Sequence, residues 1–181
     1  MCGFCGFSDK LKTNEKKKII KNMADRIIHR GPDSDGYYVD DKIAMGFRRL
    51  SIIDLKGGDQ PLYNEDKSVI VMFNGEFYNY KEIRENLKDK HKFVTNSDTE
   101  VIVHGYEEYG TDIFNKLRGM FGIMIYDKHK EMLIGARDYF GIKPVYYYNK
   151  DNLFMVGSEI KSFLSHPNFD KEINKETLSL Y

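Results

Sequence analysis

Strand-like runs in this chain come in blocks, and the helical patterns lie between the blocks instead of following each run. β-branched and aromatic residues dominate these runs. Strands that alternate one by one with helices form parallel sheets, whereas clustered strands pair mainly with antiparallel neighbours. The sequence therefore predicts an α+β fold with mainly antiparallel pairing. The runs are 2–7, 36–40, 42–54, 68–75, 120–127, 131–138, 144–149 and 153–159.

The clearest helical pattern spans residues 14–31, where apolar side chains recur at helical spacing until Gly31 and Pro32 stop the helix. The apolar positions are Ile19, Ile20, Met23, Ile27 and Ile28. In a later pattern, Ser97 and Glu100 stand in the S-x-x-E order of a capping box. The remaining helical patterns are 79–90, 97–110, 112–119 and 158–166, and an extended stretch is expected at 91–95.

Composition limits the classes of partner and the compartment. The 181 residues fit one domain with a sizeable core. Lys plus Arg and Asp plus Glu number 28 each, so no net charge draws the chain to nucleic acid or to an anionic membrane. No apolar run approaches a membrane span, and residues 1–30 lack the apolar region of a secretory signal. With two cysteines and no export signal, the expected location is the reducing cytoplasm.

The last residues bear on domain organisation. Residues 169–181 begin a helical pattern that stops at Tyr181 without a cap or a terminating glycine. We therefore expect 1–165 to form one domain and 166–181 to begin the connection to a further, C-terminal domain.

The stretch MCGFCGF places one thiol at Cys2 and another at Cys5, which raises three interpretations. A redox pair normally lies where a strand runs into a helix, and only Met1 precedes Cys2. On a strand, side chains three residues apart point to opposite faces, which disfavours both a disulfide and a shared metal. A four-ligand zinc site would also need histidines, and no metal site is expected because their spacing matches no known pattern. They are His29, His91, His104, His129 and His166.

The third interpretation follows from the position of Cys2. Methionine is normally removed before a small second residue, which would leave Cys2 with a free α-amine. Such an amine has an ordinary pKa of about 7.7 to 8.0, against about 8.5 for a thiol, so it can accept the thiol proton near neutral pH. One residue would then supply both nucleophile and base. From the residues alone, a small buried hydrophobic side chain remains the commoner role of a cysteine.

A series of stretches makes the chain resemble the glutaminase domain of glutamine-hydrolysing asparagine synthetases, in the family's order from Cys2 to about Leu164. The resemblance implies an N-terminal-nucleophile hydrolase fold, a four-layer αββα sandwich of two antiparallel sheets between helical layers. It makes Cys2 the expected nucleophile. The stretches are MCGFCGF, HRGPDSDG, RRLSIID, QPLYN, FNGEFYNY, NSDTE, LRGMFGIMIYD, ARDYFGIKPVYY and SEIKSFL.

Related amidotransferases that make glucosamine phosphate, phosphoribosylamine or glutamate also begin at a processed cysteine. The stretches RRLSIID, LRGMF, FGIKP and SEIK point to the asparagine-synthetase branch, which also includes enzymes that amidate other carboxylates. The chain departs from the family at two positions to which we assign no chemistry. Phe47 stands where members often carry His, and Tyr139 where they often carry Arg.

The resemblance also implies the groups that stabilise the oxyanion. The Asn74 side-chain amide and the Gly75 backbone N–H would bind the amide oxygen as it becomes negative, an effect of about 3 kcal/mol per donor in comparable sites. Glycine at 75 would let the backbone come close to a ligand. From the residues alone, an Asn-Gly turn between two strands is the favoured alternative.

A site for free glutamine must also pair a carboxylate and an ammonium group. Arg49 is expected to grip the carboxylate with two hydrogen bonds, and Asp98 to take the ammonium. The alternatives are a surface arginine at a strand end and a first-turn carboxylate stabilised by the helix dipole. Family placement adds Glu76 to the substrate-contacting segment. It also adds the backbone that lines the pocket, which comprises Leu50, Ser51, Ile52 and Ile53.

Two charged stretches are expected to be structural. HRGPD, with His29, Arg30 and Asp33, is interpreted as a turn after the first helix, and ARDYFGIKP as a strand, turn and strand in which Gly141 and Pro144 set the turn. By resemblance, the second stretch supports the site and its contact with a partner domain. A Cys–His dyad using His29 or His104 is disfavoured because the α-amine makes a histidine base unnecessary.

The expected reaction is hydrolysis of L-glutamine through a Cys2 thioester, without metal or organic cofactor. Asparagine formation would also need ATP and magnesium, and these belong to a synthetase domain, because the chain has no Gly-rich S-G-G-x-D-S phosphate loop. The expected partners are L-glutamine and a C-terminal synthetase domain or subunit, with a homodimer as a further option. A different amide acceptor, or a degenerate fold kept as a docking module, are the alternatives.

Overall fold

The computed structural model describes residues 1–50, 58–173 and 175–178, and these form two antiparallel sheets with helices on their outer faces. One sheet has the order β2-β3-β1-β9-β8, and the other has the order β4-β5-β6-β7. The first sheet is built from β1 (Gly3–Ser8), β2 (Ser34–Val39), β3 (Ile43–Arg49), β8 (Tyr146–Lys150) and β9 (Leu153–Gly157). The second is built from β4 (Leu62–Tyr63), β5 (Val69–Phe77), β6 (Gly119–Asp127) and β7 (Met132–Arg137).

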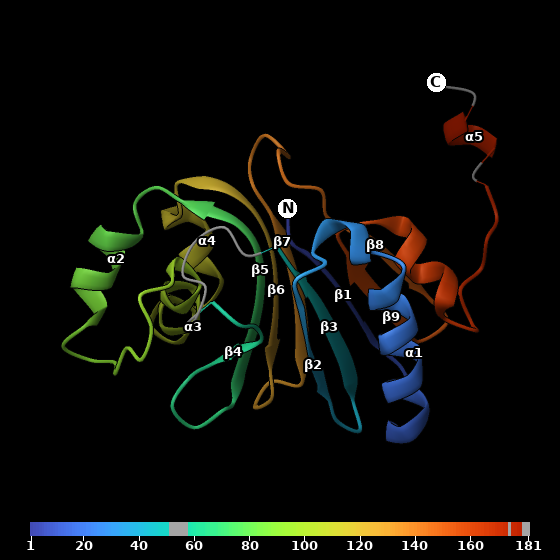
Figure 1. Cartoon of the computed structure of the whole chain (residues 1–181), viewed down its shortest axis with the longest axis horizontal. Coiled ribbons are helices and arrows are strands. Elements are labelled where there is room, and N and C mark those ends of the chain that lie inside the picture. Colours follow the sequence, from blue (N-terminus) through green and yellow to red (C-terminus); the bar gives the residue numbers. More distant parts are fainter. Residues whose placement is uncertain (51–57, 174, 179–181) are drawn as a thin grey trace.

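The two sheets pack face to face, and a helical layer covers each outer face (Figure 1). Three apolar clusters fill the spaces between the four layers. One lies between the sheets and includes Phe4 and Met72, a second lies under α1 (Thr13–Asp25), and a third lies under α3 (Asp98–Tyr109). The predicted α+β sandwich with antiparallel pairing is confirmed, since every strand pair in the described residues is antiparallel.

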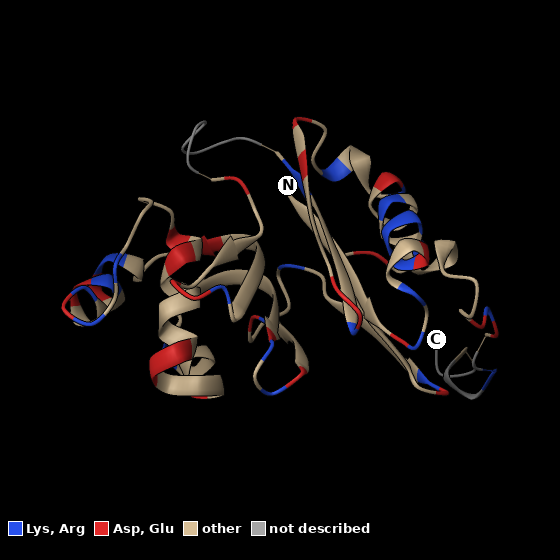
Figure 2. Cartoon of the chain, turned by 90° about the horizontal axis from the view of Figure 1, so that it is seen from below, with Lys and Arg blue, Asp and Glu red and all other residues tan. Residues whose placement is uncertain are grey.

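The first helix is shorter than its sequence pattern. α1 ends at Asp25, and a 3-10 turn, η1 (Ile28–Arg30), follows it. Ile20, Met23 and Ile27 are buried as expected, but Ile28 is 48% exposed because the chain leaves the helical path before reaching it. Lysine is the basic residue of α1, and its positions stand out along the ribbon (Figure 2). Lys17, Lys18 and Lys21 are exposed, whereas Lys16 is fully buried.

Cys2, which immediately precedes β1, and Cys5 within β1 pack against different apolar clusters, so the two thiols are separated as the alternation predicted. Cys5 is fully buried with the cluster under α1, whereas Cys2 packs against the cluster between the sheets. Burial raises the pKa of the Cys5 thiol far above its ordinary value. Cys5 is therefore a packing residue with little thiolate character.

The helical layer over the second sheet contains α2 (Tyr80–Leu87), α3 and α4 (Ile113–Lys116), with the 3-10 turn η2 (Gly110–Asp112) before α4. The predicted capping box at α3 is half right. The Ser97 hydroxyl accepts the Thr99 N–H at 3.1 Å, but the Glu100 carboxylate accepts the N–H groups of Val94 and Thr95 instead of that of Ser97. Glu100 is almost fully buried, which directs it toward these earlier backbone donors.

The last part of the chain, after β9, contains short helical segments. Helical turns follow β9 as η3 (Ile160–Ser165), which packs on α1, and the short α5 (Lys175–Leu178) lies apart from the sandwich (Figure 1). A connection to a further domain beginning at 166 stays a prediction. No helix in the described part of the chain is long and apolar enough to cross a membrane.

Candidate active site

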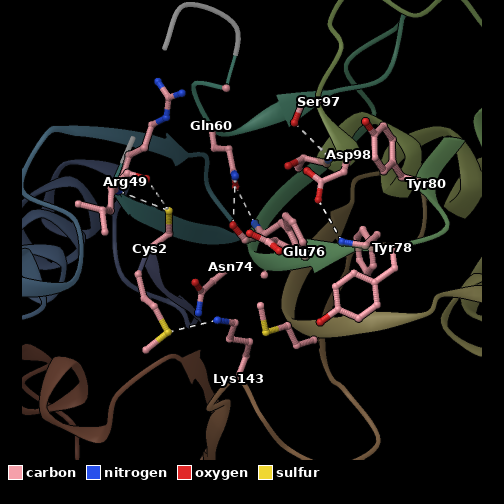
Figure 3. A pocket seen from close by; sticks show the side chains of 18 of the residues that line it. Cys2, Arg49, Gln60, Asn74, Glu76, Tyr78, Tyr80, Ser97, Asp98 and Lys143 are labelled. Atoms are coloured by element: carbon pink, nitrogen blue, oxygen red, sulfur yellow. Dashed lines mark hydrogen bonds between the residues drawn. The ribbon is translucent and has the colours of Figure 1, made fainter. Parts of the chain in front are cut away.

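A cavity of about 270 Å³ opens at one end of the sandwich, where the start of β1, the end of β3, the end of β5 and the start of α3 meet (Figure 3). Most of the predicted site residues line it. Among the predicted site residues, Ser51, Ile52 and Ile53 lie outside the described part of the chain. Those that line the cavity are Cys2, Arg49, Leu50, Asn74, Gly75, Glu76 and Asp98.

Cys2 is half-buried, and the backbone on either side of it is fixed. Its Sγ lies 3.4 Å from the Leu50 N and 3.6 Å from the Leu50 O, so the backbone of Leu50 lies beside the thiol (Figure 3). The Arg30 Nε donates to the Cys2 carbonyl at 2.9 Å, and Arg30 also pairs with Glu159 at 3.0 Å. Arg30 thus has a definite function in the expected turn, because it holds the residue proposed as nucleophile.

Asn74 stands on β5 with its amide group beside Cys2 and Lys143 (Figure 3). The residue is only 3% exposed, and its Nδ2 has no hydrogen-bond partner among the described residues. A buried N–H group without a partner costs about 1–3 kcal/mol, so such groups are rare unless a ligand completes them. The Asn74 amide is therefore available to a substrate oxygen in the cavity.

Gly75 follows Asn74 inside β5, which excludes the alternative of an Asn-Gly hairpin turn. Its lack of a side chain is required by the neighbouring strand rather than by a ligand. A Cβ at this position would lie 2.1 Å from the Met120 O of β6. The close approach of these two strands is what places the Gly75 backbone at the cavity wall.

Asp98 is the first residue of α3, and its Oδ2 accepts the Phe77 N–H at 3.2 Å. Burial raises the pKa of Asp98, and the N–H groups of Phe77 and Thr99 lower it by less, so the pKa stays above its ordinary value. Glu76, at the end of β5, is exposed at the mouth of the cavity. Two carboxylates thus lie where a ligand ammonium would find a partner.

Arg49 ends β3 and is almost fully buried, yet its guanidinium is turned away from Asn74 in the cavity (Figure 3). Its Nη1 lies 2.9 Å from the Asp59 Oδ1, and the Asp59 side chain is 76% exposed. The carboxylate side of this ion pair is open to solvent, so a ligand carboxylate would compete with Asp59 for the Arg49 guanidinium.

Two residues that sequence reasoning missed shape the cavity. Gln60 Nε2 donates to the Phe73 O at 3.1 Å and Gln60 Oε1 accepts the Phe73 N–H at 2.6 Å, which fixes the backbone immediately before Asn74. Lys143 is buried with its Nζ 3.2 Å from the Met1 Sδ. Both residues belong to stretches quoted for the resemblance, Gln60 to QPLYN and Lys143 to FGIKP, so the resemblance is the signal that could have identified them.

The remaining candidates lie elsewhere. His29 pairs with Glu159 at 2.8 Å, and His104 lies among carboxylates on α3, so neither ring contacts Cys2. Phe47 is buried in the core, and Tyr139 is exposed on the turn after β7, so neither departure from the family pattern lines the cavity. The Asp138 carboxylate anchors that turn by accepting the N–H groups of Ile142 and Lys143.

Comparison with known proteins agrees with this architecture. The chain matches the family described as "Glutamine amidotransferase domain" over residues 1–181. It is 48% identical to asparagine synthetase [glutamine-hydrolyzing] 1 of Bacillus subtilis, in a match that covers 100% of this chain and 29% of that protein. It is 43% identical to asparagine synthetase [glutamine-hydrolyzing] 2 of Oryza sativa, over 90% of the chain and 28% of that protein.

Solved structures share the fold at low sequence identity. The glutamine phosphoribosylpyrophosphate amidotransferase of B. subtilis, solved with ADP and GMP, has a TM-score of 0.72 and 18% identity and covers 91% of this chain and 43% of its own. A second structure, titled as the allosteric regulatory enzyme of purine biosynthesis, has a TM-score of 0.74 and 21% identity over the same shares.

The two-sheet sandwich and the cavity at its end agree with the class of glutamine amidotransferase domains. The chain belongs to the glutamine amidotransferase domain family. It spans less than a third of the length of the curated asparagine synthetases named above.

Proposed function

We propose that this chain is the glutaminase part of an asparagine synthetase, and that it hydrolyses L-glutamine to glutamate and ammonia through a Cys2 thioester. The observation that carries the proposal is the buried Nδ2 of Asn74, which has no hydrogen-bond partner in the described part of the chain and lies in the same cavity as the Cys2 thiol. A nucleophile and an available N–H donor facing one cavity are the minimum for acyl transfer.

In the proposed reaction the α-amine of Cys2, freed by removal of Met1, takes the thiol proton. The thiolate attacks the amide carbon, and the C–S bond forms while the negative oxygen is held by the Asn74 Nδ2 and the Gly75 N–H. The C–N bond then breaks, and ammonia leaves with the proton returned by the amine. Water attacks the thioester, which releases glutamate and restores the thiol.

Substrate recognition is assigned to the two charged ends of the cavity. Arg49 would bind the glutamine carboxylate in place of Asp59, and Asp98 with Glu76 would bind the ammonium. Pairing with an ammonium favours the ionised form of Asp98 and offsets the burial that raises its pKa. Glutamine thus supplies the charges that this part of the cavity accepts.

The ammonia released by this chain would be used elsewhere in the whole protein. It would pass to an ATP-dependent synthetase domain that amidates aspartate, and ATP and magnesium would act only there. The identities of 48% and 47% to two B. subtilis asparagine synthetases support this acceptor. Another acceptor remains a distinct candidate, because a protein named amidase chry2 is 37% identical over 91% of the chain.

The N-terminal mechanism is tested by comparing three forms of the chain: Cys2 at the terminus, two alanines placed ahead of Cys2, and the Cys2 terminus with Cys5→Ser. Mass spectrometry verifies each terminus, and thioester trapping and ammonia release are measured. The alanine extension converts the amine into an amide that accepts no proton, so hydrolysis should be lost while the thiol stays intact. Cys5→Ser should retain activity apart from a packing cost.

An active alanine-extended form would refute the mechanism. A folded but inactive Cys5→Ser form would instead show that the activity requires both cysteines, as the redox-pair and metal-site interpretations do. For the acceptor, the full-length protein with glutamine, aspartate, ATP and magnesium should form asparagine, and the isolated chain should form none. If the full-length protein consumed glutamine under these conditions without forming asparagine, another acceptor would be favoured.

A further inference from the structure

Four potential metal ligands converge on the outer side of the second sheet, away from the glutamine cavity. Glu65 lies in the turn between β4 and β5, His91 follows α2, and His104 and Glu107 lie on one face of α3. One ligand atom from each side chain lies within 4.8 Å of all the others. Three segments far apart in sequence thus bring two imidazoles and two carboxylates to one point.

Four separations between nitrogen and oxygen atoms of the cluster lie near those of a tetrahedral zinc site, and because the whole set extends to 4.8 Å, a bound ion would draw the ligands closer together. Zn–N and Zn–O bonds of about 2.0–2.2 Å in a tetrahedron place neighbouring ligand atoms about 3.3 to 3.5 Å apart. The His104 Nδ1 lies 3.1 Å from the Glu107 Oε2 and 3.6 Å from the Glu65 Oε2. The His91 Nδ1 lies 3.5 Å from the same Glu107 oxygen and 3.6 Å from the Glu65 Oε1.

His91 has a carboxylate at its second nitrogen. The His91 Nε2 lies 3.3 Å from the Glu108 Oε1, and in metal sites such a carboxylate orients the ring and fixes which nitrogen carries the proton. The buried His104 Nε2 has no hydrogen-bond partner among the described residues, and the Glu100 Oε1 lies 3.7 Å from it. The Nδ1 of each ring is the nitrogen that lies beside the carboxylates of Glu65 and Glu107.

The ligand carboxylates are positioned in the same way. The Asn64 Nδ2 donates to the Glu107 Oε1 at 2.7 Å, which leaves Oε2 toward the two imidazoles. The Lys92 N–H donates to the Glu65 Oε1 at 3.0 Å. The His104 side chain is 2% exposed, whereas those of Glu107 and Glu65 are 23% and 43% exposed, so an ion can enter from the solvent side.

We propose that Glu65, His91, His104 and Glu107 form a structural zinc site. Two nitrogen ligands disfavour Mg²⁺ and Ca²⁺, which take oxygen ligands, and suit Zn²⁺. No metal site was expected from the sequence, because the histidine spacing alone matches no zinc pattern. Two of the four ligands are glutamates, and the tertiary fold alone brings Glu65 to the others.

The site would fasten α3 to the β4–β5 turn and to the segment after α2. His104 is six residues beyond Asp98 on the same helix, a rise of about 9 Å at about 1.5 Å per residue. A metal here would therefore hold the helix that begins in the glutamine cavity. Carboxylates lie at both ends of α3 (Figure 2).

The competing description is a metal-free ion-pair cluster in which protonated histidines neutralise the glutamates. Zinc binding distinguishes the metal site from the metal-free cluster. The untagged chain is stripped with chelator, dialysed, and given ZnCl₂, and bound zinc is counted by mass spectrometry. Affinity is measured by competition with a chelating dye, Mg²⁺ serves as the control ion, and Co²⁺ is added separately to record its visible absorption.

We expect one zinc per chain, intense tetrahedral Co²⁺ absorption, and a Tm increase of about 5 °C or more at a 100-fold excess over Kd. His91→Gln and Glu65→Gln should weaken zinc binding by more than the about 10- to 100-fold typical of losing a partner behind a ligand. His129→Gln is the matched control, because the His129 side chain is 77% exposed, lies outside the cluster and is 3.7 Å from the Asp66 carboxylate. Its zinc affinity should be unchanged.

The proposal is overturned if the chain retains no zinc and its Tm does not respond. It is also overturned if His91→Gln and Glu65→Gln bind zinc as tightly as the parent chain, which would indicate scattered surface binding. Octahedral Co²⁺ absorption would exclude the tetrahedral site even if a variant failed to fold.

Discussion

Replacing Asn74 by alanine should separate catalysis from stability. If the Asn74 Nδ2 binds the oxyanion, its removal lowers kcat by about 100- to 1000-fold, the loss seen when one oxyanion donor is deleted. KM for glutamine should change little, because the interaction forms mainly in the transition state.

The stability change depends on the missing partner of the Asn74 Nδ2. This atom makes no hydrogen bond among the described residues, so its removal breaks none and relieves a desolvation cost of about 1–3 kcal/mol. The small cavity left behind opposes this gain. The net effect on Tm should lie between no change and an increase of about 5 °C, at about 2–4 °C per kcal/mol for a chain of this size.

Asn64→Ala is the matched control, because Asn64 is 5% exposed but fully engaged. Its side chain bonds to the Ser68 hydroxyl, the Glu107 carboxylate and the Val69 N–H. Loss of three such bonds at about 0.5–1.5 kcal/mol each should lower the Tm by at least about 3 °C and leave kcat unchanged.

Ammonia release from glutamine, in a coupled dehydrogenase assay, gives kcat and KM for both variants, and calorimetry gives Tm. A kcat for Asn74→Ala within threefold of the parent would refute the oxyanion assignment. A Tm loss as large as that of Asn64→Ala would show that the Asn74 amide serves the fold.

The remaining predictions concern the charged ends of the cavity. Arg49→Ala and Asp98→Ala should each lower kcat/KM for glutamine at least about 30-fold in steady-state kinetics, because each leaves one substrate charge unpaired; near-normal values for both would show that the pocket is misplaced. Because its folded pKa is raised, Asp98 stabilises the free chain below its unfolded pKa of about 3.9, and that contribution is lost as the pH rises through the folded pKa. Asp98→Asn should therefore gain stability relative to the parent as pH rises through that window in denaturant titrations, and an unchanged difference across pH would contradict the raised pKa.

Local patterns in the sequence predicted most of the fold because each element carries its own signal. The clustered strand runs predicted antiparallel pairing, and α1 followed from its apolar spacing. The errors came at boundaries, where tertiary contacts override local preference. Ile28 fits the helical period but lies past the end of the helix, and Glu100 fits the capping order but is drawn to Val94 and Thr95.

The site was less predictable from residues alone. Without the family resemblance, Asn74-Gly75 would be assigned to a turn, and Arg49 and Asp98 to a strand end and a helix start. Whether each contributes to a cavity depends on the closure of β5 on β6 and of β1 on β3, contacts between distant parts of the chain. The cluster that contains Glu65 and His91 also forms through contacts between distant parts of the chain. No sequence spacing predicts that a glutamate in the β4–β5 turn lies beside His91.

In the cavity, the side-chain atoms proposed to react have few hydrogen bonds, whereas the backbone beside them is held by hydrogen bonds from other side chains. The Cys2 thiol has only long contacts to Leu50, at 3.4 and 3.6 Å, and the Asn74 Nδ2 is unpartnered among the described residues. The backbone beside each is held firmly, by Arg30 at the Cys2 carbonyl and by both amide atoms of Gln60 at Phe73. Groups that must bind a reacting molecule cannot be satisfied by the fold, so their positions are fixed through neighbouring backbone. A sequence motif identifies the reactive residues, whereas the supporting side chains can come from any segment that folding brings near.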